Sequence, residues 1–233
     1  RFKKLHDTLG INAFKFRIGT ECGRDEDEWP GRSEEIIKII NQNLDPNTAK
    51  LVDANSCFSP KRAIEIGHIL EDNDVSHFEE PCPYWELEWT AEVAAALNLD
   101  VAGGEQDCWL PVWRRMIDID AVDVVQPDIC YVGGLDRAMR VAKMAQAKGK
   151  LCVPYSANLS LVTVFSLHLM GAIENAGNYV EFSIEPTSWT KKLFTPALTV
   201  IDGKVQIPSA PGWGIEIRPD WLESADYQLS TAS

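Results

Sequence analysis

Short apolar runs alternate along the chain with longer segments that carry helix-capping residues at their ends. The short runs predict β-strands, because a strand of a parallel sheet is covered on both faces and reads as a nearly continuous apolar stretch. Seven such runs lie within residues 11–19, 49–55, 75–81, 100–106, 121–128, 151–156 and 179–185. Strict alternation of strand and helix favours an α/β fold.

Capping residues place the expected helices. They lie at residues 33–43, 60–72, 86–97, from 111 onward, 135–148 and 159–173, and residues 1–10 read as the end of a further helix. Ser33 suits an N-cap, Pro60 a first turn and Gly149 a C-terminal stop. After the seventh run the pattern changes, and Asp202-Gly203 between two alternating runs predicts a β-hairpin.

Acidic side chains recur close to the expected strand ends at a nearly constant interval. Asp53, Glu79, Glu105 and Asp128 are separated by 26, 26 and 23 residues, and the series continues to Tyr155 and Glu181 after 27 and 26 more. A strand, a helix and two loops occupy this length, so the interval is one β/α unit. In a β/α barrel all strands end on one face, where active sites are built. Because clustered carboxylates repel one another, a hard divalent cation is the expected counter-charge.

Composition narrows the range of partners. The 233 residues are 45% hydrophobic, enough for one sizeable core. No run approaches the roughly 20 apolar residues of a membrane span. The net charge of −13 disfavours nucleic acid and anionic lipid, which bind basic surfaces. Six cysteines form no CxxC pair, so we expect small buried side chains in a reducing compartment rather than a zinc or iron–sulfur site.

An ordered set of motifs resembles the enolase superfamily, and within it the mandelate racemase/muconate lactonizing enzyme-like group. The motifs are Lys15-Phe16-Arg17, Asp53-Ala54-Asn55, Glu79-Glu80-Pro81, Gly104-Glu105, Pro127-Asp128, Gly133-Gly134 and Glu181. The resemblance implies a TIM-type (β/α)7β barrel. Because seven strands leave an open sheet, we expect that the first barrel strand and the N-terminal capping domain are missing. Residues 1–188 would form the truncated barrel, and residues 189–233 a segment that returns toward the cap.

By this resemblance, Asp53, Glu79 and Glu105 hold Mg²⁺. Three anionic oxygens with open positions for a chelating substrate also suit this ion on chemical grounds. Glu80 follows Glu79 in its strand and is expected to point to the opposite side as a structural acid. Asn55 lies two residues after Asp53 and would face the same way, where the family often places a ligand or substrate contact; an Asx-turn is the alternative.

The resemblance also assigns groups that handle the substrate. Glu181 matches a last-strand acid that, when protonated, hydrogen-bonds the substrate carboxylate; a paired acid in the barrel wall is the alternative. Lys15 and Arg17 share a strand face where the family carries two lysines, the first neutralising the carboxylate and the second removing a proton. Arg17 stays protonated and suits a carboxylate clamp instead. Lys15 is then the candidate nitrogen base.

Tyr155 occupies the strand end where this group commonly has a His, paired with the acid that Asp128 matches. Nearby cations and a metal would lower its pKa, so it is a candidate acid or base on the side opposite Lys15; a packing or hydrogen-bonding role is the alternative. The four histidines of the chain lie elsewhere, and His77 is expected to lie early in its strand, away from the mouth.

Two further groups of residues are expected near the same end of the strands. The loop of residues 20–32 is rich in charge and is expected to be a solvated run, with closure over a substrate as the alternative. Five aromatic residues follow the third and fourth strands, and we expect most of them to pack between helices. They are Tyr84, Trp85, Trp89, Trp109 and Trp113.

Together these expectations predict that the protein is an enzyme, a lyase of the acid-sugar dehydratase type. It would use Mg²⁺ to remove the α-proton of a small carboxylate substrate, a sugar acid, and eliminate the β-hydroxyl from the resulting enediolate. A racemase or epimerase of a hydroxy acid is the alternative, as is a homologue that kept the metal ligands and lost the chemistry. We expect neither nucleic-acid nor membrane partners, a cytoplasmic location and, by resemblance, a homo-oligomer.

Overall fold

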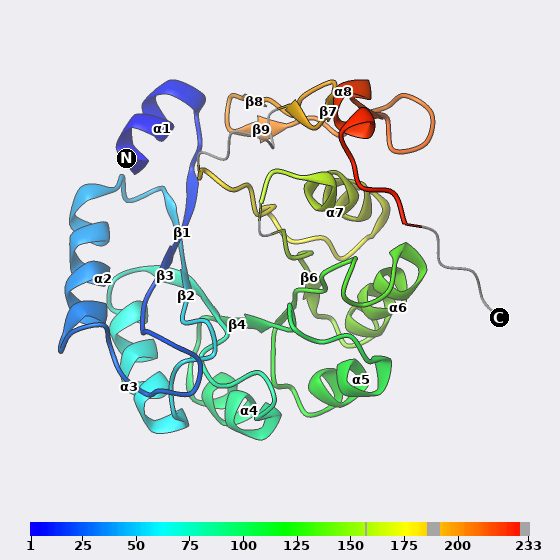
Figure 1. Cartoon of the computed structure of the whole chain (residues 1–233). Helices are drawn as coiled ribbons and strands as arrows, with labels where there is room; N and C mark the ends of the chain where they lie inside the picture. The colour runs from blue at the N-terminus through cyan, green and yellow to red at the C-terminus, as the bar shows by residue number, and fades with distance from the viewer. Residues whose placement is uncertain (157, 186–191, 229–233) are drawn as a thin grey trace.

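The computed structural model describes residues 1–156, 158–185 and 192–228. Its centre is a parallel sheet with the strands hydrogen-bonded in chain order. They are β1 Ala13–Arg17, β2 Ala49–Asp53, β3 Val75–Glu79, β4 Asp100–Gly103, β5 Val124–Val125 and β6 Leu151–Cys152. Six of the seven expected strands are therefore confirmed, as is the parallel α/β architecture. In Figure 1 the strands surround a common centre and the helices lie outside them.

The helices match the expected residue ranges closely. They are α1 Phe2–Leu9, α2 Arg32–Asn43, α3 Pro60–Glu71, α4 Leu87–Ala96, α5 Leu110–Asp118, α6 Leu135–Gln146 and α7 Leu161–Ala172. Pro60 occupies the first turn of α3, and Ser59 caps that helix by accepting the N–H of Arg62. Neighbouring helices pack side by side in chain order around most of the ring. No described helix combines the length and apolar character needed to cross a bilayer.

One apolar layer fills the space between the sheet and the helices. The strands contribute Phe16, Val52, Phe78 and Val101, and the helices contribute Ile37, Ile66, Val93 and Trp113, all of them buried. Burial of each such side chain stabilises the fold by about 1.5–3 kcal/mol. In β1 the outward Phe14 and Phe16 alternate with Lys15 and Arg17. The shared face predicted for Lys15 and Arg17 is therefore confirmed.

The seventh expected strand, at residues 179–185, is wrong. No strand forms there, and a single parallel bridge between Cys152 and Ala176 follows β6 instead. Pro154 explains the early end of β6, because proline has no N–H to donate to a neighbouring strand. Within the described residues, backbone hydrogen bonds run from β1 to β6 and do not close the sheet on itself.

The loop of residues 20–32 is exposed along most of its length but is fixed to the start of α3. Asp25 Oδ1 accepts the N–H of Ser59 at 2.6 Å, and the N–H of Gly23 donates to Ser56 O at 2.8 Å. The expected N-cap at Ser33 is wrong, because α2 already begins at Arg32 after Gly31. The buried Ser33 hydroxyl instead accepts the N–H of Gly19 at 3.1 Å, which ties the loop to β1.

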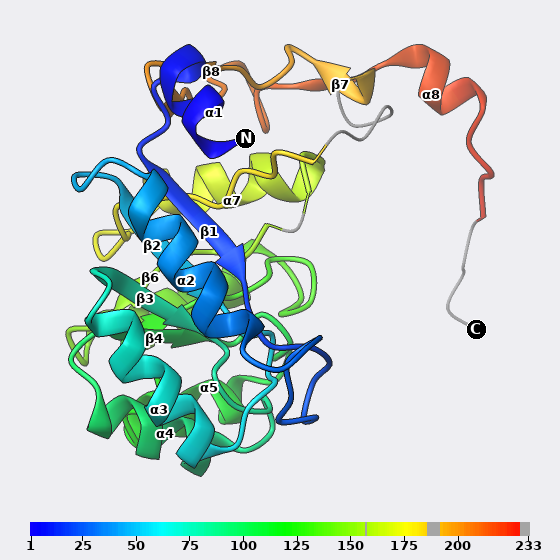
Figure 2. The ribbon, with the colours of Figure 1, turned by 90° about the vertical axis from the view of Figure 1, so that its left-hand side faces the viewer.

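The C-terminal segment folds over the end of the ring that carries α1 and α7 (Figure 2). It contains β7 Phe194–Thr195, β8 Val200–Ile201, β9 Lys204–Val205, β10 Glu216–Ile217 and α8 Pro219–Glu223. The predicted hairpin is confirmed, since β8 and β9 pair antiparallel about Asp202-Gly203, both with positive φ.

Two contacts fix this segment to the helices. The N–H of Gly203 donates to Leu9 O at 2.6 Å, and Trp213 O lies 3.0 Å from His168 Nε2 while its indole packs 4.5 Å from the Phe165 ring. The domain boundary expected between residues 188 and 189 lies outside the described residues.

The close approach of Gly104 to Trp113 leads to a first prediction. Gly104 has φ +109, and a Cβ there would lie 2.2 Å from the Trp113 ring. Gly104→Ala should lower the free energy of unfolding by about 2–5 kcal/mol, because backbone strain and overpacking act together. Gly149→Ala is the matched control, since Gly149 has φ +72 but nothing within 4 Å of its Cβ position. Equal losses in the two variants, measured by urea denaturation, would contradict the steric explanation.

Candidate active site

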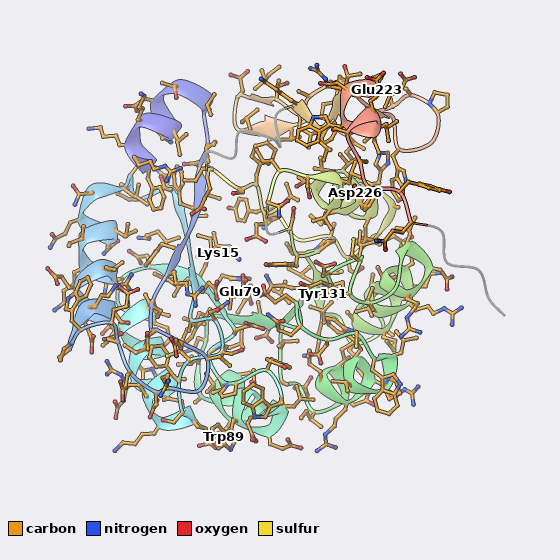
Figure 3. All side chains as sticks on the ribbon, viewed as in Figure 1. Lys15, Glu79, Trp89, Tyr131, Glu223 and Asp226 are labelled. Carbon is orange, nitrogen blue, oxygen red and sulfur yellow. The ribbon has the colours of Figure 1, made fainter. Side chains whose placement is uncertain are left out.

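Carboxylates from three neighbouring strands gather at one end of the sheet. Asp53 and Glu79 are the last residues of β2 and β3 and stand opposite each other in the parallel register. Glu105 follows two residues after β4. Glu79 and Glu105 are almost completely buried, and Asp53 is partly buried. Figure 3 shows Lys15 and Glu79 inside the ring, near the centre of the molecule.

Lys15 is the cation that contacts these acids directly. Its Nζ donates to Glu79 Oε1 at 2.6 Å and lies 3.0 Å from Glu181 Oε1. Burial would lower the pKa of Lys15, but the charges of Glu79, Glu181 and Asp53 outweigh it and raise the pKa above the ordinary value. The structure therefore favours the ammonium form, which suits charge neutralisation and opposes a role as base in this state.

Glu79 is also held on its second oxygen. Gln126 Nε2 donates to Glu79 Oε2 at 2.8 Å, and His77 Nε2 lies 3.6 Å from the same oxygen, beyond normal hydrogen-bond length. Burial raises the pKa of Glu79, but Lys15, His77 and Gln126 outweigh it and lower the pKa below its usual range. The ionised form of Glu79 is thus favoured.

Sequence reasoning missed Gln126 and placed His77 away from the site. Both positions carried a usable signal, because His77 stands two residues before Glu79 and Gln126 two residues before Asp128. Alternation along a strand places such residues on the face of the functional acid. His77 Nε2 lies only 3.6 Å from Glu79 Oε2, so its expected separation from the acid site is wrong.

The other acids are short of positive charge. Burial, then Glu80 and Glu79, raise the pKa of Glu105 to about 9, and burial, then Asp53 and Glu79, raise the pKa of Glu80 to about 8. Burial and the charge of Glu79 also raise the pKa of Asp53. Such a group of hard oxygen donors fits a divalent cation in charge and chemistry. Within the described residues, no three acidic, His or Cys side chains already surround a common ion position.

Glu80 lies on the helix side of the sheet, as predicted. It lines a small cavity with Thr90, Met116 and Val122, and it is buried. A second hollow, of about 750 Å³, lies in the C-terminal segment and is lined by residues such as Leu198, Ile201 and Val205, with no acid among its lining. The candidate active site is therefore at the strand ends and not in either cavity, because the charged side chains gather at the strand ends.

Asn55 does not continue the strand. Strand β2 ends at Asp53, and Asn55 has φ +47, so the predicted shared orientation of the two side chains is wrong. An Asx-turn is present, but Asp53 forms it, because Asp53 Oδ1 accepts the N–H of Asn55 at 2.7 Å. The alternative, an Asx-turn formed by the side chain of Asn55, stays a prediction. Arg17 stands opposite Asp53 in the register, is exposed, and donates from Nη2 to Thr20 O at 3.3 Å. Its guanidinium is available at the rim of the site.

Asp128 and Tyr155 do not form a side-chain pair with each other. Asp128 Oδ1 accepts the N–H groups of Cys130 and Tyr131 at 2.6 and 3.0 Å, so this buried acid organises the turn after β5. Burial, with the charges of Glu105 and Glu181, raises the pKa of the Tyr155 phenol, opposite to the expected lowering. Tyr155 is therefore a proton donor in this state.

Glu181 lies close to the site although its expected strand does not form. Its Oε2 accepts the N–H of Ser156 at 2.9 Å, and Ser156 Oγ shares a hydrogen bond with Thr163 Oγ1 at 2.8 Å. Together with the Lys15 contact, these bonds hold Glu181 across the opening between β1 and the segment after β6. Tyr131 lies within the same ring in Figure 3 and is largely exposed, and no sequence pattern indicated this position.

The expectation that most of the five aromatic residues pack between helices is wrong, and the expectation of buried cysteines is correct for three of the six. Trp113 packs in the core, whereas Tyr84, Trp85, Trp89 and Trp109 are all exposed, and Figure 3 places Trp89 at the periphery. All six cysteines are free: Cys57, Cys82 and Cys152 are buried as expected, while Cys22, Cys108 and Cys130 are exposed.

Comparison with known proteins identifies the family. The family model described as enolase C-terminal domain-like matches residues 1–221. The chain belongs to the enolase superfamily. Its structural neighbours place it with the mandelate racemase/muconate lactonizing enzyme-like group; one of them, from Paracoccus denitrificans, is 26% identical with a TM-score of 0.87, and the match covers 100% of this chain and 62% of that one.

Other relatives in the enolase superfamily are enzymes of related kinds. Arabinonate dehydratase of Saccharolobus solfataricus is 26% identical over 92% of this chain and 55% of its own length. D-galactarolactone cycloisomerase of Agrobacterium fabrum is 28% identical over 91% of this chain and 56% of its own length. A solved structure from Roseobacter denitrificans, named as a candidate racemase, is 54% identical with a TM-score of 0.95 over 98% of this chain and 63% of that one. The chain thus spans about half the length of the curated relatives it matches.

The hydrogen bonds of Asp128 lead to a second prediction. Asp128→Asn keeps an oxygen that can accept the N–H groups of Cys130 and Tyr131, whereas Asp128→Ala leaves these donors without it. The alanine variant should lose about 1–3 kcal/mol of unfolding free energy, and the asparagine variant much less. Thermal and urea unfolding would test this difference. Equal stability of the two variants would show that the turn does not depend on this side chain.

Proposed function

We propose that the whole protein is a Mg²⁺-dependent lyase that removes the α-proton of a sugar acid and eliminates its β-hydroxyl. The observation that carries this proposal is the gathering of Asp53, Glu79 and Glu105 at three consecutive strand ends, with Lys15 Nζ 2.6 Å from Glu79. Membership of the enolase superfamily and the similarity to arabinonate dehydratase support it.

Asp53, Glu79 and Glu105 would hold the ion. The raised pKa values of Asp53 and Glu105 support this assignment, because they reflect buried carboxylates with too little positive charge nearby. When bound, Mg²⁺ supplies positive charge that stabilises the anion formed on the substrate carboxylate as the α-proton leaves.

The surrounding side chains then divide the remaining tasks. Arg17 at the rim suits the clamping of a carboxylate, and the phenol of Tyr155 suits protonation of the departing β-hydroxyl. Lys15 is the nitrogen closest to the acids, and it acts as base only after losing the proton that Glu79 and Glu181 now stabilise. Neutralising Glu79 and Asp53 with a cation removes part of that stabilisation and lowers the pKa of Lys15.

We also propose that the barrel is completed by a strand outside residues 1–233. The edge of β1 has no backbone partner among the described residues, and Lys15 and Glu181 face each other across that gap at 3.0 Å. Residues 1–188 then form the incomplete catalytic barrel, and residues 189–233 continue toward a capping domain. The greater length of the relatives supports this organisation.

Racemisation is the second candidate, because the Roseobacter denitrificans neighbour shares 54% identity and bears a racemase name. A racemase needs a base on each face of the α-carbon, and Lys15 and Tyr155 are the groups to test. Incubating the protein with candidate sugar acids in D₂O separates the two reactions. Exchange with loss of water supports the lyase, whereas exchange with inversion and no loss of water supports the racemase.

The ligand assignment gives a third prediction. In the whole protein, Glu105→Gln should weaken Mg²⁺ binding by about 100-fold or more, since loss of a ligand exceeds the typical effect of an outer hydrogen bond. Isothermal titration calorimetry without substrate measures this directly. Glu92→Gln, on the exposed surface of α4, is the matched control and should bind like the parent. Unchanged affinity in Glu105→Gln would remove the proposed site.

The choice of base gives a fourth prediction. Lys15→Met should abolish α-proton exchange with D₂O, whereas Tyr155→Phe should retain exchange and slow the loss of the β-hydroxyl. Lys15→Arg separates base from charge, because arginine keeps the cation and cannot give up its proton. If Lys15→Arg exchanges the α-proton, Lys15 is not the base and serves only to neutralise negative charge. Normal exchange in Lys15→Met with none in Tyr155→Phe would reverse the assignment.

A further inference from the structure

Gln126 is a buried amide whose direction is set by the backbone. It follows β5, and its N–H donates to Gly103 O at 2.9 Å, which extends the pairing with β4 by one residue. Pro127 comes next, and a residue before proline is restricted to extended backbone. The side chain is only 5% exposed. The Gln126 amide therefore reaches the interior of the ring from a fixed point at the strand ends.

The two oxygens of Glu79 have different partners. Oε1 accepts from Lys15 Nζ at 2.6 Å, and Oε2 accepts from Gln126 Nε2 at 2.8 Å. The terminal torsion of a glutamate is otherwise broad, so two donors on opposite oxygens fix the plane of the carboxylate. Lys15 reaches Glu79 from the middle of β1, and Gln126 reaches it from the residue directly after β5.

We propose that Gln126 is a positioning residue that holds Glu79 in the orientation needed to bind the divalent cation. This inference rests on the proposed function, because Glu79 is a proposed ligand there. Carboxylate ligands of metal ions are themselves hydrogen-bonded, and removing the outer partner typically weakens metal binding by about 10–100-fold. Gln126 Oε1 is buried without a partner among the described residues, so the amide is held in place chiefly through its bond to Glu79.

The direct experiment replaces Gln126 with methionine, which keeps the length of the side chain and removes the donor. Calorimetry of the whole protein with Mg²⁺ and no substrate should show about 10–100-fold weaker binding. Gln146→Met is the matched control: Gln146 Nε2 donates to Glu174 Oε2 at 2.7 Å, the same chemistry on an exposed surface. That variant should bind Mg²⁺ like the parent protein.

A double-mutant cycle distinguishes positioning of Glu79 from a general structural role. If Gln126 acts through Glu79, then Gln126→Met should have little further effect on Mn²⁺ affinity in a Glu79→Gln background. Electron paramagnetic resonance of bound Mn²⁺ reports both affinity and the symmetry of the ligands, and the spectrum should change in Gln126→Met alone. Gln126→Asn, which withdraws the amide by one methylene, should change metal binding in the same direction if the methionine variant folds poorly.

The outcomes separate the two proposals. The positioning role is supported if three results are found together. The parent protein binds the metal ion, Gln126→Met weakens that binding, and Gln126→Met causes no further loss of metal affinity in the Glu79→Gln background. Parent binding with unchanged affinity in both Gln126 variants overturns that role and leaves the proposed function standing. Equal losses in the parent and Glu79→Gln backgrounds also overturn it, since the effect is then independent of Glu79. Absence of metal binding in the parent overturns both.

Discussion

Repulsion between buried carboxylates is the constraint on which the rest of the site depends. Burial is the largest cause of the raised pKa values of Asp53, Glu80 and Glu105, and the charges of neighbouring acids raise these values further. Glu79 is the one of these four acids whose pKa is lowered, because Lys15, His77 and Gln126 together outweigh the effect of its burial. The arrangement favours any additional positive charge, and the proposed cation would supply it.

The fold explains how acidic residues that are distant in the chain come close enough to repel one another. Parallel strands in chain order bring each strand end to the same face, and the helices bury the outward side of the sheet around residues such as Phe78 and Trp113. The close contact between Gly104 and Trp113 fixes the backbone directly before Glu105. Residues that stabilise the core are therefore next to the residues of the site. Substitutions in the core beside a strand end should change the positions of the acids.

Much of this could be predicted from the sequence, because strands, helices and acids share one interval. The spacing indicated Asp53, Glu79 and Glu105 as strand-end acids, and the resemblance to the enolase superfamily assigned them to the metal and Lys15 to the substrate. The seventh strand could not be placed, since its hydrogen bonds depend on neighbours: Pro154 ends β6 early, and the edge of β1 is unpaired in the described residues. The local sequence pattern does not show whether a neighbouring strand is present to accept and donate the backbone hydrogen bonds.

The remaining failures concern side chains whose role is set by three-dimensional neighbours. Asn55 turns into positive φ because Asp53 captures its N–H, and Ser33 is taken by Asp27 and Gly19 instead of capping α2. Gln126 resembled an ordinary polar residue before a proline, and only the structure shows its bond to Glu79. Single-residue roles of this kind require the contact itself.

The most direct measurement is anomalous scattering from crystals of the whole protein grown with Mn²⁺ in place of Mg²⁺. The account predicts one strong anomalous peak in contact with carboxylate oxygens of Asp53, Glu79 and Glu105, with Gln126 still bonded to the far oxygen of Glu79. A peak held by other residues, or none at the strand ends while Lys15 keeps its contact with Glu79, would contradict the central claim.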